Sequence, residues 1–279
     1  MDPLIHRIRA WDGLSLYVRI WRGGDRLPPI LCLPGLVRTG GDFEALAPWI
    51  AEGRLMVAID YPGRGDSGRT QDVERYTPEA CARDVADVCA ALHVPDAVVI
   101  GTSFGGVLAL GLAAMRPGLV RAVVLNDIGP DIGADGADFV RDFVGVDPAL
   151  ESLSACVDYL RDCLPPLSLH TDEAWRRMAE LTYRQGDDGR FHTLWDTNIA
   201  KLMHRPPPDL WPLFGALERG PVLLVRGEVS NILLVDTVAR MQAMRPDMEV
   251  ITLPGIGHAP ILTEPPALSA IQAFLERHA

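Results

Sequence analysis

The sequence is poor in positive charge. Its 279 residues include 26 lysines and arginines, of which only Lys201 is a lysine, against 37 acidic residues, for a net charge of −11. A chain this acidic repels nucleic-acid phosphates and anionic lipid, so we expect neither nucleic acid nor a membrane as a partner. Hydrophobic residues make up 48% of the chain, which excludes a largely disordered protein.

Cysteine is also scarce. The five cysteines include no CxxC spacing, and their odd number favours a reduced protein of the cytoplasm over a secreted disulfide scaffold. The N-terminal residues show no apolar stretch after a basic start, so we expect no signal peptide. The uncharged run 97–115 contains four glycines, which indicates a buried strand leading into a helix rather than a membrane span.

Patterns typical of strands and helices alternate over most of the chain. Strands are expected at 6–9, 14–21, 29–33, 55–59, 97–100, 120–125, 221–225 and 249–253, and helices at 42–50, 77–92, 104–115, 234–244 and 264–277. Such alternation predicts an α/β fold with a mostly parallel, twisted sheet and helices on both of its faces. We expect 1–129 and 211–279 to form this core.

The stretch 130–210 interrupts the alternation. Its apolar residues recur at helical spacing, Pro165-Pro166 separates two such stretches, and the three prolines at 206–208 precede the return to the strand pattern. The sequence therefore predicts a helical lid, or cap, inserted after the sixth strand of the core.

The motif with the clearest chemical meaning is Gly-Thr-Ser-Phe-Gly-Gly at 101–106. It follows an apolar strand pattern and precedes an alanine- and leucine-rich helix, which is the context that a nucleophile elbow requires. In such a turn the serine hydroxyl stands exposed at the start of the helix. Ser103 is therefore the candidate nucleophile.

A serine hydroxyl needs a base to take its proton. Of the seven histidines, His258 lies in a Gly-His sequence between the last expected strand and the last expected helix. Loops at the carboxyl edge of a parallel sheet lie near one another, so His258 can reach Ser103 and is the candidate base.

The elbow, the late Gly-His, a glycine-containing loop after the third strand and the inserted lid together resemble the α/β-hydrolase superfamily over nearly the whole chain. In most members the acid of the triad follows the strand that here ends at Val225. That loop holds Asn231 where an aspartate would be expected. An amide oxygen can accept a hydrogen bond from the imidazole Nδ1–H but cannot balance an imidazolium charge.

A second carboxylate follows the strand after the elbow helix. Some branches of the superfamily, including many haloalkane dehalogenases and the zearalenone-type lactonases, place the acid after that strand, where this chain has Asp127. We therefore expect Asp127 to orient His258, with Asn231 or Glu228 as the alternatives. Asp127 could instead serve only to cap the turn that follows it.

Acyl transfer also needs donors for the developing oxyanion. The resemblance assigns this role to the backbone N–H of Phe104 and to that of Leu36 in the loop after the third strand. Family members often read His-Gly in that loop, whereas this chain reads Pro34-Gly35. The segment 60–68 resembles a turn that members often carry after strand four, and we expect its residues to hold that loop.

These residues predict a serine hydrolase of the esterase or lactonase type that works through an acyl-enzyme on a small to medium hydrophobic ester or lactone. Trp175, Tyr183 and Trp195 of the lid are expected to line its pocket. No group of His, Cys, Asp and Glu has metal-ligand spacing and no cofactor motif occurs, so we expect neither a metal nor a cofactor.

Three alternatives use the same fold. A C–C bond hydrolase of the meta-cleavage-product type would share the triad, but such relatives often carry Trp shortly after the histidine, where this chain has Ala259-Pro260. A hydroxynitrile lyase would need a lysine near the histidine, and Lys201 lies in the expected lid. A non-catalytic ligand-binding receptor is the third alternative, and Asn231 is the residue that favours it.

Overall fold

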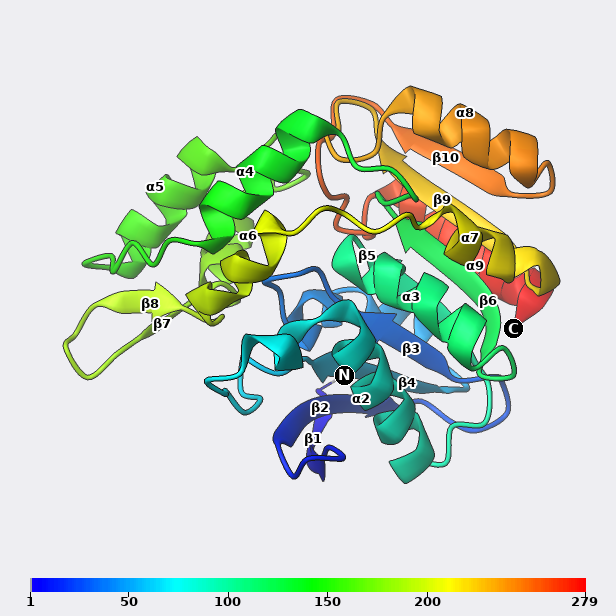
Figure 1. The fold of residues 1–279 in the computed structure, drawn as a ribbon, viewed down its shortest axis with the longest axis horizontal. Coiled ribbons are helices and arrows are strands. Elements are labelled where there is room, and N and C mark those ends of the chain that lie inside the picture. The colour runs from blue at the N-terminus through cyan, green and yellow to red at the C-terminus, as the bar shows by residue number, and fades with distance from the viewer. Residues whose placement is uncertain (1) are drawn as a thin grey trace.

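An eight-stranded sheet forms the centre of the structure, a computed structural model that describes residues 2–279 (Figure 1). Its strands follow the order β1-β2-β4-β3-β5-β6-β9-β10. They are β1 (Leu4–Arg9), β2 (Ser15–Arg22), β3 (Ile30–Leu33), β4 (Leu55–Asp60), β5 (Ala97–Thr102), β6 (Val120–Asn126), β9 (Val222–Gly227) and β10 (Glu249–Leu253). β2 pairs antiparallel with β1 and with β4, and the other pairings are parallel.

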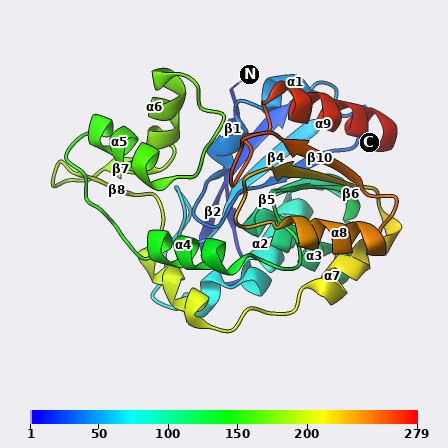
Figure 2. The ribbon, with the colours of Figure 1, turned by 90° about the horizontal axis from the view of Figure 1, so that it is seen from above.

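Helices cover both faces of this sheet (Figure 2). One face carries α2 (Pro78–Ala91), α3 (Phe104–Met115), α7 (Trp211–Gly215) and α8 (Val235–Met244), and the other carries α1 (Ala47–Ile50) and α9 (Pro265–His278). The central strands are therefore buried on both sides, which explains why β5 and β9 read as continuous apolar runs without alternation. The predicted mostly parallel α/β sheet is confirmed.

Most expected elements lie within a residue or two of their observed bounds. Thr77 caps α2, since its side-chain oxygen accepts a hydrogen bond from the Ala80 N–H at 3.4 Å and Pro78 is the first helical residue. The single helix expected at 42–50 is instead two short pieces, the 3₁₀ turn η1 (Gly40–Phe43) and α1. Pro48 near the start of α1 marks this break, because proline favours the first turn of a helix over its interior.

The segment 130–210 lies between β6 and β9 and extends beyond the carboxyl ends of the strands (Figure 1). It contains α4 (Ala134–Val144), α5 (Leu153–Cys163), α6 (Asp172–Glu180), the hairpin of β7 (Tyr183–Gln185) and β8 (Phe191–Thr193), and the 3₁₀ helix η3 (Thr197–His204). The expectation of helices alone was wrong for the hairpin. Gly189 allows that turn because it has φ +80°, and the Gly186 N–H donates to the Arg190 carbonyl at 2.7 Å.

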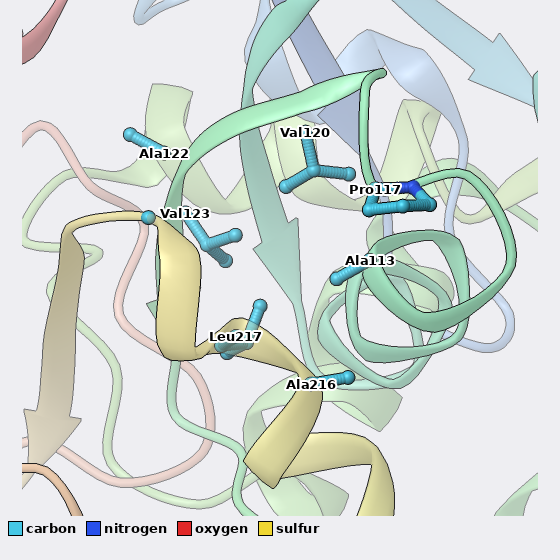
Figure 3. A pocket seen from close by; sticks show the side chains of 8 residues that line it. Ala113, Pro117, Val120, Ala122, Val123, Ala216 and Leu217 are labelled. Carbon is cyan, nitrogen blue, oxygen red and sulfur yellow. The ribbon is translucent and has the colours of Figure 1, made fainter.

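A small cavity lies at the amino ends of the strands, where α3 ends and β6 begins (Figure 3). Its volume is about 20 Å³ and its walls include Ala113, Val120 and Leu217. A space of that size has room for about one water molecule, so it is a packing void and not a substrate site. Within residues 2–279, no helix combines the length and the apolar character needed to cross a bilayer.

Candidate active site

Ser103 occupies a sharp turn between β5 and α3. Its backbone has φ 52° and ψ −118°, a conformation that residues other than glycine rarely adopt. Glycine is required on both sides because a Cβ on Gly101 would lie 2.6 Å from the backbone of Gly105, and one on Gly105 would lie 2.0 Å from the Leu33 carbonyl oxygen. Close packing of β3, β5 and α3 therefore accounts for the Gly-x-Ser-x-Gly pattern and presents the serine hydroxyl at the start of the helix.

His258 lies in the loop between β10 and α9 and contacts Ser103. Its Nε2 is 2.9 Å from the Ser103 Oγ, and its Nδ1 is 2.7 Å from Oδ2 of Asp127. The loop is held from two sides, since the Gly257 N–H donates to the Pro166 carbonyl at 2.7 Å and the Asn126 side-chain amide donates to the Pro260 carbonyl at 2.8 Å. The side chains of Ser103, His258 and Asp127 thus form a continuous hydrogen-bonded chain.

Asp127 directly follows β6 and is fully buried. Its second oxygen, Oδ1, accepts a hydrogen bond from the Gly227 N–H at 2.9 Å, at the end of β9. Both carboxylate oxygens therefore have partners, and the short bond to His258 has the length of a charge-assisted hydrogen bond. The strand that carries the acid in most family members here contributes a backbone donor.

The two alternative acids lie elsewhere. Asn231 is exposed at the surface. The Glu228 side chain is exposed as well and accepts a hydrogen bond from the Gly255 N–H at 2.9 Å. Of the three candidates, Asp127 is the one that the fold brings to His258.

The loop after β3 passes beside the serine. A Cβ on Gly35 would lie 3.9 Å from the Ser103 Cβ. The carbonyls of this loop are bound, since Pro34 O accepts from the Tyr61 hydroxyl at 3.2 Å and Leu36 O accepts from the Arg64 Nε at 2.8 Å. The Leu36 N–H donates to no acceptor within residues 2–279.

Phe104, the other expected oxyanion donor, is the first residue of α3. The first amides of a helix have no acceptor inside the helix, and they sit at the positive end of its dipole. The N–H of Phe104, directly after Ser103, and that of Leu36, directly after Gly35, therefore stay the two predicted oxyanion donors.

The three aromatic residues expected in the pocket differ in burial. Trp175 on α6 is half-buried, with the Arg161 guanidinium 5.5 Å from its ring centre. Trp195 is 1% exposed and its indole N–H donates to the Val144 carbonyl at 2.9 Å. Tyr183 is also buried, and burial raises the pKa of its hydroxyl. Their role in a pocket stays a prediction, and both Trp195 and Tyr183 contribute to the apolar packing of the segment itself.

Residues that could provide other chemistry are dispersed. Among the residues that the structure describes, no group of three or more His, Cys, Asp or Glu side chains is placed to hold a metal ion. Cys81, Cys89 and Cys156 are buried free thiols. Burial raises the pKa of Cys81 and Cys156 to about 11 and that of Cys89 to about 12, so these thiols are not activated as nucleophiles.

Comparison with known proteins agrees with the fold. The model of the alpha/beta hydrolase fold family matches residues 28–265. A 3-hydroxybutyrate-oligomer hydrolase from Cupriavidus necator is 32% identical over 264 residues, which cover 90% of each chain. A 2-(acetamidomethylene)succinate hydrolase from Mesorhizobium japonicum is 28% identical and covers 99% of this chain and 96% of that one. The crystal structure of an alpha/beta hydrolase from Novosphingobium aromaticivorans is 37% identical, with a TM-score of 0.92 over 99% of both chains.

Proposed function

The chain belongs to the α/β-hydrolase fold family, and on that premise we propose that it is a cofactor-free serine hydrolase that cleaves a small to medium hydrophobic carboxylic ester or lactone. The observation that carries this proposal is the chain of hydrogen bonds from the Ser103 hydroxyl through His258 to the buried Asp127. Such an array activates a serine for attack on a carbonyl carbon.

In the proposed reaction His258 takes the Ser103 proton as the serine oxygen attacks. Asp127 holds the imidazole in the tautomer that presents an unprotonated Nε2, and its charge stabilises the imidazolium that forms. His258 then gives the proton to the leaving alcohol, which leaves an acyl-enzyme. Water activated by His258 releases the acid in the second half of the reaction.

We assign the oxyanion hole to the backbone N–H groups of Leu36 and Phe104. The loop of Leu36 passes beside Ser103, and Phe104 opens the helix that follows it. Fixed donors of this kind stabilise the tetrahedral intermediate more than the substrate, and this difference lowers the barrier.

We propose that the segment 130–210 is the lid that selects the substrate, with Trp175 exposed enough to contact it. A similar protein carries the name 3-hydroxybutyrate-oligomer hydrolase, so short esters of hydroxy acids join aryl esters and lactones as the first substrates to test. The cytoplasm remains the proposed location. Asn231 gave the receptor alternative its support, and that support weakens because Asp127 is the residue that contacts His258.

Labelling with a fluorophosphonate tests the proposal. Intact-protein mass spectrometry should show one adduct, and the matched variant Ser103→Ala should show none while it keeps the parent melting temperature. Hydrolysis of the ester panel should fall by on the order of 10⁵–10⁶ in that variant, and dialysis against EDTA should leave the parent rate unchanged. Absence of an adduct in the folded parent, or equal labelling of both proteins, would overturn the proposal.

A further inference from the structure

Arg64 is a buried cation held by backbone carbonyls. It lies in the turn after β4 and is fully buried. Its Nε donates to the Leu36 carbonyl at 2.8 Å, and its Nη1 donates to the Pro62 carbonyl at 2.6 Å. Burial lowers the pKa of this guanidinium. The rings of Tyr61, Tyr76 and Phe104, 5.5–5.8 Å from its Cζ, and the charge of Asp196 offset part of the cost of burying this cation.

Arg64 touches both residues assigned to the oxyanion hole. It binds the carbonyl of Leu36, and its Cζ lies 5.6 Å from the ring centre of Phe104. The Tyr61 ring packs edge-on against Phe104 at 5.6 Å, and the Tyr61 hydroxyl donates to the Pro34 carbonyl. Tyr61 and Arg64, both in the turn after β4, therefore bind the carbonyls on either side of the Gly35–Leu36 peptide. Both residues also pack against the Phe104 ring.

The backbone around Arg64 is itself fixed by the segment 130–210. The Gly65 N–H donates to the Leu194 carbonyl at 2.7 Å, and the Asp196 N–H donates to the Gly63 carbonyl at 2.8 Å. The two bonds join the residues on either side of Arg64 and Trp195, which pair as a single antiparallel β-bridge. The Arg64 main chain, from which the side chain reaches Leu36, is consequently held in place.

We propose that Arg64 is a positioning residue that holds the Leu36 main chain so that the Leu36 N–H stays directed at the oxyanion. This inference rests on the proposed function, because it takes Ser103 as the nucleophile and Leu36 as a donor. Arg64 acts through Leu36 and does not touch the substrate. Its contribution is greatest in the transition state, when charge develops on the carbonyl oxygen.

Arg64→Met removes the donor to Leu36 and keeps a side chain of similar length. Loss of a whole oxyanion donor costs ~10²–10³ in kcat, so a displaced donor should lower kcat by on the order of 10–100-fold, with KM within about threefold. Affinity for an alkylboronic acid, whose serine adduct places an oxygen in an oxyanion hole, should fall by a similar factor. Arg64→Lys keeps one donor nitrogen and is expected to lose less, about 3–10-fold in kcat.

Arg245→Met is the matched control. Arg245 is also buried and also donates to backbone carbonyls, those of Leu217 and Gly220, but it lies near the start of β9, away from Ser103. Unlike Arg64, it also forms an ion pair, with Asp247. Its loss should lower the melting temperature as Arg64→Met does and leave kcat and boronic-acid affinity within about twofold of the parent.

The outcomes separate the two proposals. If the parent protein forms no Ser103 adduct with a fluorophosphonate, the proposed function fails. If the parent reacts but a folded Arg64→Met protein keeps parental kcat and boronic-acid affinity, the role of Arg64 fails. Should Arg64→Met not fold, Arg64→Lys decides, and parental values for both measurements in that variant would overturn the inference.

Discussion

The sheet and the segment 130–210 are stabilised in different ways. Each face of the sheet carries one large apolar cluster that joins strands and helices distant in the sequence. The segment contains two small clusters, one centred on Val144, Trp195 and Ile199 with Tyr76 from the sheet side, and one on Cys156, Leu160, Ala179 and Tyr183. Apolar burial is therefore extensive beneath Ser103 and modest within the segment.

Polar contacts provide many of the links between the two regions. The bonds are Arg38 to Thr182 at 2.5 Å, the Tyr76 hydroxyl to Asp196 at 2.8 Å, Arg184 to Asp66 at 2.8 Å and the Ser168 hydroxyl to Glu264 at 2.7 Å. The ion pair of Arg184 and Asp66 is exposed and contributes little stability, whereas the other three bonds are partly buried. The comparison teaches that the reacting groups are fixed by a large apolar core, whereas the region proposed to choose the substrate is attached through a small apolar cluster and individual hydrogen bonds.

The largest loss of activity is expected on substitution of Asp127, the carboxylate at the end of β6. Asp127→Asn should lower kcat by on the order of 10²–10⁴, because an amide cannot stabilise the imidazolium and favours the wrong tautomer. Steady-state kinetics on an aryl ester measures this loss. The melting temperature should change less than activity, since the amide keeps the volume and an acceptor for the Gly227 N–H.

Asn231→Ala is the control for that measurement. Asn231 is exposed, so its truncation should leave kcat within about twofold of the parent. An inactive Asn231→Ala protein together with an active Asp127→Asn protein would reverse the assignment of the acid.

The next effect concerns the core of the segment. Trp195→Ala should cost about 3–5 kcal/mol of local stability, because it leaves a cavity beside Phe143 and removes the donor to the Val144 carbonyl. Hydrogen exchange should show loss of protection over 183–204 while β5 and β6 stay protected. Trp175→Ala, at a half-buried site, should cost less stability and instead change the ratio of kcat/KM between short and bulky esters. A uniform loss of protection across the whole chain would show that the two regions unfold as one unit.

Local patterns explain which parts were predictable. The elbow at Ser103 and the α2 cap at Thr77 are each encoded within about six residues, and periodicity marks the strands and long helices. The side chains of Ser103, His258 and Asp127, chosen from their places along the chain, are the ones that the structure brings together. The short strands of the β7–β8 hairpin carry too few residues to show a period.

Two other contacts between distant residues were not predictable. The Arg64 side chain reaches Leu36, 28 residues away, and the Gly227 N–H reaches Asp127 across 100 residues. Neither contact leaves a pattern in one sequence, because the partners are chosen by the packing of β4 against β3 and of β9 against β6. The turn at 60–68 was expected to hold its own loop, and the structure adds that it also binds the loop beside the serine.

The smallest effect is a pH response confined to the hairpin of the segment. His192 Nδ1 lies 2.7 Å from Asp147 and its Nε2 lies 3.1 Å from Asp188. Hydrogen bonding to Asp147, and then to Asp188, raises the pKa of His192 above its ordinary value of 6.5. The protonated imidazole is therefore favoured in the folded hairpin. Its stabilisation is fully present below pH 6.5 and is lost as the pH rises through the higher folded-state pKa.

NMR titration of the imidazole should give a pKa above 6.5 in the parent and a lower one in Asp147→Asn, which removes the charge and keeps the side-chain size. Amide exchange over β7 and β8 should be slower in the parent than in His192→Gln at pH 5.5, and this difference should shrink at pH 8.5, with β5 and β6 unaffected at both. A His192 pKa at or below 6.5, or a difference that grows with pH, would contradict the prediction. Because His192 and both of its carboxylate partners lie within the segment 130–210, the pH response should distinguish this segment from the core that holds Ser103.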